Sequence, residues 1–115
     1  MNTTETKFEQ AEQFLESAKK ELNRPAEDVV PYMVCKSTHK SIAHFLMGFL
    51  LQNNVAFNEE DSVEVLLKKC QNISDKFNNL DLKPITFSKD YEYSTEFNQM
   101  QKCIDLANHT KELVH

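Results

Sequence analysis

The chain has 115 residues, and 40% of them are hydrophobic, which is enough for the core of one small domain spanning residues 1–115. A single glycine and three prolines disfavour both a β-fold rich in tight turns and a disordered chain. The formal net charge of -5 argues against a general nucleic-acid binder, which presents a net basic face, but it leaves room for a local basic strip.

The first helix is predicted from Thr6 to Asn23. Thr6 and Glu9 have the spacing of a capping box, and Pro25 ends the helical pattern. The apolar residues of this segment recur at steps of three and four, which is typical of an amphipathic helix: Phe8, Ala11, Leu15, Ala18 and Leu22.

The second helix is predicted from Asp28 to Asn53 and is the segment around which we expect the rest to be arranged. The short link before it favours an antiparallel pairing with the first helix, and Pro31 fits its first turn. Charged and histidine side chains in its middle leave an apolar run far shorter than the ~20 residues of a membrane span, so none is expected.

The third helix is predicted from Ser62 to Ser74, a short extra helix over residues 75–80, and a last helix from Ser88 to Val114. The sequence therefore predicts an all-α fold: an antiparallel up-down-up-down four-helix bundle with a short extra helix between helices 3 and 4. The residues expected to be buried in its core are Phe8, Leu15, Leu22, Val34, Phe45, Phe49, Leu66, Cys70, Phe97, Ile104 and Ala107.

Two lines of side chains on the second helix are candidates for function. Small or modest residues at Ser37, Ser41, His44 and Gly48 allow another helix to approach closely. That helix belongs either to a second copy of the chain, which would make this line a dimer interface, or to the same chain. Lys36, Lys40 and His44 follow one another at a spacing of four and form a basic line that suits a phosphate or an acidic partner; the alternative is a solubilising face.

No residue pattern points to catalysis, a metal or a cofactor, so none is expected. Cys35 and His39 share a helix face, but a zinc site needs three or four convergent ligands. The acidic residues 59–61 fit a solvated loop at the start of a helix. Three cysteines without a CxxC pair and an N-terminus without an apolar signal segment predict a cytoplasmic protein.

The segment DVVPYMVCKSTHKSIAHFLMGFLL, residues 28–51, resembles the second helix of HEPN-family proteins. AEQFLESAKKEL, SVEVLLKKCQNISDKFNNLDL and CIDLANHTKELV resemble the other helical segments of that family, so the resemblance covers residues 6–114. It implies a small helical bundle that binds a nucleotide or RNA, forms a homodimer and acts beside a nucleotidyltransferase, as in toxin–antitoxin pairs.

Two departures from the family pattern bear on activity. The polar motif of the family's second helix falls on Lys40–Gly48, where its glutamate is missing and His44 replaces a lysine. The Arg-x4-6-His motif of ribonuclease members is absent, since Arg24 is the only arginine and only Lys102 precedes His109 at a comparable spacing. We therefore predict a non-catalytic binding module; the alternatives are a metal-independent ribonuclease using His109 or His44, and a purely structural dimer.

Overall fold

The computed structural model describes residues 3–25, 27, 31–82 and 97–115, and within these ranges the chain is helical, with no strand. The helices are α1 (Thr3–Leu22), α2 (Pro31–Gln52), α3 (Val63–Ile73) and α4 (Phe97–Val114), and a 3₁₀ helix, η2 (Asp75–Phe77), follows α3. The prediction of an all-α protein with four helices is confirmed. The predicted first residues of the second and fourth helices, Asp28 and Ser88, lie outside the described residues.

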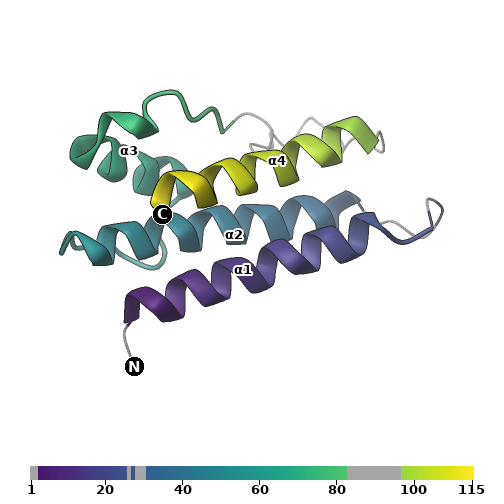
Figure 1. Cartoon of the computed structure of the whole chain (residues 1–115), viewed down its shortest axis with the longest axis horizontal. Coiled ribbons are helices and arrows are strands. Elements are labelled where there is room, and N and C mark those ends of the chain that lie inside the picture. The colour runs from purple at the N-terminus through teal and green to yellow at the C-terminus, as the bar shows by residue number, and fades with distance from the viewer. Residues whose placement is uncertain (1–2, 26, 28–30, 83–96) are drawn as a thin grey trace.

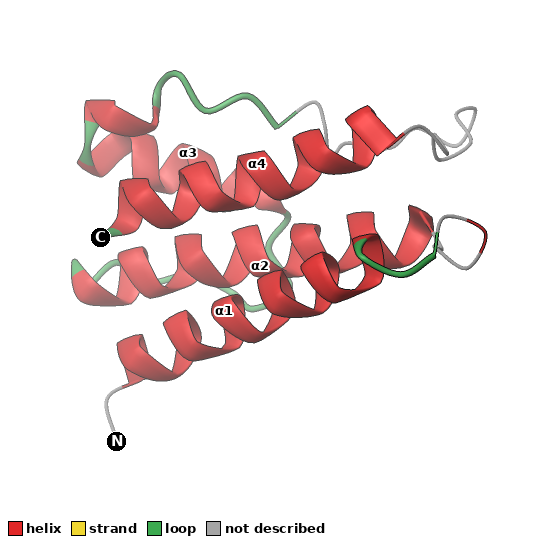
Figure 2. Cartoon of the chain, turned by 45° about the vertical axis from the view of Figure 1, so that its right-hand side comes forward, coloured by secondary structure: helices red, strands yellow, loops and turns green. Residues whose placement is uncertain are grey.

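The helix α2 lies at the centre of the arrangement, in contact with α1, α3 and α4 (Figure 1). The helix α1 runs in the opposite direction to α2, as the short link between them predicts, whereas α4 runs in the same direction as α2 (Figure 2). An ion pair of 2.8 Å between Lys111 and Glu12 also joins α4 to α1. The structure therefore confirms that the second helix is the central one, as predicted.

The direction of α3 corrects the predicted up-down-up-down order. The Cys70 thiol lies 3.7 Å from the carbonyl oxygen of Leu46, and further along both segments the Phe77 ring centroid lies 4.8 Å from that of Phe49. The later residue on one segment therefore meets the later residue on the other, so α3 runs in the same direction as α2 and is not antiparallel to it. The reason lies in the preceding connection: Asn54 reverses the chain with a φ of 59°, and about ten residues are enough to return along α2 before α3 begins.

The ends of α3 are set by serine caps. The Ser62 hydroxyl accepts a hydrogen bond from the Val65 N–H at 3.2 Å, and the Ser74 N–H donates to the Cys70 carbonyl at 3.0 Å. The predicted boundaries are therefore correct to within one residue. Where the sequence predicts a short extra helix over residues 75–80, the structure has the single 3₁₀ turn η2, in which the Lys76 N–H donates to the Ser74 hydroxyl at 3.4 Å.

The core is one cluster that contains most of the predicted residues: Leu15, Leu22, Val34, Phe45, Phe49, Leu66, Cys70, Ile104 and Ala107 are buried. Phe8 is only half-buried, at the edge of the contact between α1 and α2. The side chain of Phe97 lies outside the described residues. Two buried hydroxyls, of Thr38 and Thr110, donate to carbonyl groups four residues earlier in their own helices, which satisfies them inside the core. Among the described helices, none is long and apolar enough to cross a membrane.

Candidate functional site: the groove between α1 and α2

The small-residue line predicted on α2 faces α1 of the same chain. Ser41 is fully buried, and its hydroxyl donates to the carbonyl oxygen of Ala11 at 2.7 Å. A side chain at position 48 would place its Cβ only 2.5 Å from Cε1 of Phe8. Ser41 and Gly48 are therefore covered by α1 of the same chain. Their small size lets α1 approach α2, the other possibility that the sequence left open.

The other two members of the line, Ser37 and His44, lie half-buried beside α1. His44 packs against Phe14 of α1, with ring centroids 5.1 Å apart, and its Nδ1 donates to the Lys40 carbonyl oxygen at 2.8 Å. The Lys40 ammonium lies 5.5 Å from the centroid of the same Phe14 ring, within the range of a cation–π contact. The predicted residues Lys40 and His44 thus meet at one aromatic side chain of α1.

An open groove of about 380 Å³ lies between α1 and α2, towards the C-terminal end of α1. Its lining residues come from both helices and, for Arg24, from the turn after α1: Ser17, Lys20, Glu21, Arg24, Met33 and Ser37. The Arg24 guanidinium forms an ion pair of 3.2 Å with Glu21, whereas Lys20 forms no ion pair within the described part of the chain. Two cations, two hydroxyls and one carboxylate therefore surround a space large enough for a phosphate group.

The predicted basic line extends this groove along α2. Lys36 and Lys40 are exposed on neighbouring turns of α2, and Lys40 is one turn from Ser37 in the groove wall. Together with Lys20 and Arg24, Lys40 places three cationic side chains along the α1–α2 contact of a chain whose net charge is -5, and Lys36 lies one turn before Lys40 on α2. This local concentration of positive charge is what would attract a phosphate-bearing ligand.

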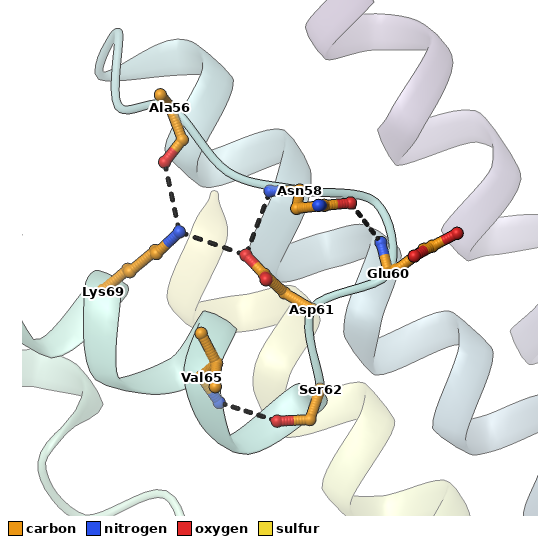
Figure 3. Close-up of polar contacts among 7 residues, drawn as sticks. All are labelled: Ala56, Asn58, Glu60, Asp61, Ser62, Val65 and Lys69. Atoms are coloured by element: carbon orange, nitrogen blue, oxygen red, sulfur yellow. Dashed lines mark hydrogen bonds and ion pairs between the residues drawn. The ribbon is translucent and has the colours of Figure 1, made fainter.

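The acidic residues 59–61 are used to hold their loop. Asp61 accepts a hydrogen bond from the Asn58 N–H at 3.0 Å and lies 3.1 Å from the Lys69 ammonium of α3 (Figure 3). The Asn58 N–H, followed by Lys69, lowers the pKa of the Asp61 carboxyl. Glu59 forms an ion pair with Lys7 of α1, and this contact lowers the pKa of Glu59. The acidic loop is therefore tied to α1 and α3 by its own carboxylates.

The residues considered for ribonuclease chemistry do not converge. His109 and Lys102 are exposed on α4, seven positions and about 10 Å apart along the helix axis. His44 lies against Phe14 on the α1 side of α2. Across the residues whose positions are described, no group of three or more His, Cys, Asp or Glu side chains is arranged to hold a metal ion.

Of the groove lining, sequence reasoning had named only Ser37, as a member of the small-residue line; it missed Met33 and the residues contributed by the α1 side. Ser17 and Lys20 lie on the polar face of an amphipathic helix and Arg24 in the turn that follows it, where all three resemble any solvated side chains. The signal that was present is the antiparallel pairing of the first two helices, which brings the end of α1 to the start of α2.

Comparisons of the chain with protein families, curated proteins and solved structures gave no match in any of the three.

Proposed function

We propose that this chain is a non-catalytic, HEPN-like binding module that holds a phosphate-bearing ligand, a nucleotide or an RNA backbone, in the groove between α1 and α2. The observation that carries the proposal is the placement of Lys20 and Arg24 around a groove whose walls also present the hydroxyls of Ser17 and Ser37. Lysine and arginine supply the charge, hydroxyl groups donate additional hydrogen bonds, and the Arg24 fork has enough N–H groups to serve Glu21 and a phosphate together.

The neighbouring aromatic residue gives the groove a place for a base. Phe14 is half-buried and lies between Lys40 and His44, beyond the Ser37 end of the groove. A nucleobase that stacks on an aromatic ring contributes about 1–3 kcal/mol without requiring a particular base. The proposed ligand therefore has its phosphate near Lys20 and Arg24 and its base near Phe14.

The test is a binding titration of the intact chain with fluorescein-labelled single-stranded RNA and with ATP. Lys20→Glu combined with Arg24→Glu should weaken binding at least tenfold and should flatten the dependence of the affinity on salt, because phosphate contacts are lost. Lys68→Glu is the matched control, since Lys68 is an exposed lysine on α3, and it should leave the affinity nearly unchanged. Equal losses in both variants, or no loss in the groove variant, would contradict the proposal.

The alternatives predict different results in the same assays. A ribonuclease would cleave the labelled RNA without added metal, and this cleavage would depend on His109 or His44. A purely structural protein would show no rise in melting temperature with any phosphate-bearing compound, because a ligand stabilises only if it binds the native state.

The proposal also includes the assembly and the cellular setting of the protein, for which the HEPN resemblance is the main support. A homodimer, a nucleotidyltransferase partner, a role in a toxin–antitoxin pair and a cytoplasmic location all follow from that resemblance or from composition. A homodimer would have to use a surface other than Ser41 and Gly48, which α1 covers. Sedimentation of the purified chain, alone and with a candidate nucleotidyltransferase, measures both associations.

A further inference from the structure

Two cysteines that are far apart in the sequence lie side by side in the core. The sulfur atoms of Cys35 on α2 and Cys103 on α4 are 3.6 Å apart, and the two residues are 68 positions apart in the chain. We propose that these two thiols are a disulfide-forming site, which hydrogen peroxide oxidises to a covalent clamp between α2 and α4. This inference is independent of the proposed ligand groove.

The geometry requires only a small movement. A disulfide bond is about 2.05 Å long, so the two sulfur atoms must approach by roughly 1.5 Å, and they already touch with no atom between them. The helices that carry them are packed against each other and run in the same direction (Figure 1). The approach that the bond requires is a rotation of the two side chains, with any remainder taken up by a slight shift of α4.

The surroundings of the pair make the two sulfurs chemically different. A hydrogen bond from the Cys35 thiol is the main cause that lowers the pKa of Cys103, and the Thr38 hydroxyl contributes in the same direction. The same contact raises the pKa of Cys35, with burial acting in the same direction. Cys103 is therefore the sulfur that ionises first, and a thiolate is the nucleophile in thiol oxidation.

The reaction takes place in two steps. The Cys103 thiolate attacks one oxygen of hydrogen peroxide, the O–O bond breaks, and the hydroxide that leaves takes up the proton lost by Cys103 to form water. The sulfur of Cys35 then attacks the resulting sulfenic acid, the S–O bond breaks, and a second water leaves with the Cys35 proton. In total, two thiols are oxidised to one disulfide, and one peroxide is reduced to two waters.

The third cysteine provides a matched control. Cys70 is also buried, but its thiol donates to the Leu46 carbonyl oxygen and lies against no other cysteine in the described part of the structure. Burial raises the pKa of Cys70 to about 12, so it stays protonated and unreactive. A Cys70→Ser chain should therefore form the same disulfide as the natural sequence.

The experiment treats the folded chain with a small excess of hydrogen peroxide in native buffer. Peptide mapping without reductant should recover the Cys35 and Cys103 peptides linked to each other, and the intact mass should fall by about 2 Da for the two hydrogens lost. The melting temperature should rise by roughly 5–15 °C, because the bond closes a long loop in the unfolded chain, and dithiothreitol should reverse the rise. Cys70→Ser should behave in the same way, and Cys103→Ser should show neither change.

Several outcomes would overturn the proposal. One is a chain in which Cys35 and Cys103 stay reduced in native buffer and are linked only after denaturant is added. Another is a product in which the linkage joins two molecules, or joins Cys70 to one of the pair. The peptide map of the natural sequence decides between these outcomes by itself, so the result stands even where Cys103→Ser fails to fold.

Discussion

Replacing Gly48 with alanine should destabilise the protein, although alanine is the better helix former. In an open helix position the exchange would stabilise by about 1 kcal/mol. Here the new methyl group would lie 2.5 Å from Cε1, 2.7 Å from Cδ1 and 3.1 Å from Cζ of Phe8, so the ring must move. Overpacking of this kind costs about 1–3 kcal/mol, and the net change expected is therefore a loss of about 0–2 kcal/mol.

The Phe8 ring has limited room to move, which is why we expect the steric cost to exceed the gain. It packs against His115, with centroids 4.8 Å apart, and lies 6.5 Å from the Phe45 ring. Displacing it from Gly48 therefore weakens contacts that join α1 to the C-terminal end of α4 and to α2.

Urea unfolding followed by circular dichroism measures the effect in a double-mutant cycle with Phe8→Ala. Once the ring is removed, Gly48→Ala should stabilise by about 1 kcal/mol, so the sign of its effect should reverse between the two backgrounds. The coupling energy between the two positions should be about 1–3 kcal/mol. If Gly48→Ala stabilises both backgrounds by the same amount, α1 does not approach α2 as described.

Three further predictions test the core and one half-buried titratable group. Phe45 is fully buried, so Phe45→Ala should cost about 3–5 kcal/mol in chemical denaturation, and a loss below about 1 kcal/mol would place the ring in a loose environment. Ser41→Ala should cost about 0.5–1.5 kcal/mol through its lost hydrogen bond, whereas the half-buried Ser37→Ala should change stability by less than about 0.5 kcal/mol. Burial lowers the pKa of His39 below its ordinary 6.5, so below that pH the unfolded state takes up the proton more readily and stability should fall as the pH falls. His39→Gln should reduce this dependence of stability on pH, whereas His109→Gln, at an exposed position, should not. An NMR titration that finds the pKa of the His39 imidazole at or above its ordinary value would refute the lowered pKa of His39.

The candidate site could be predicted from the sequence only in part. Lys40, His44 and Ser37 were identified because regular spacing on one helix places them on one line. Their partners on α1 carry no comparable signal, since a polar face is expected on any exposed helix. Which residues of α1 stand opposite them depends on how the two helices are aligned, and the closeness at Ser41 and Gly48 sets that alignment.

The sequence by itself determined the helices of this protein, because the signals that define them are local. The steps of three and four in α1 and the serine caps of α3 act between residues within one or two turns. Only the tertiary structure decided how these helices meet. The direction of α3 depends on a connection that returns along α2, and the contact of Cys35 with Cys103 depends on the placement of α4 against α2. Such contacts join residues tens of positions apart, and many packings of the same amphipathic helices would bury their apolar faces almost equally well.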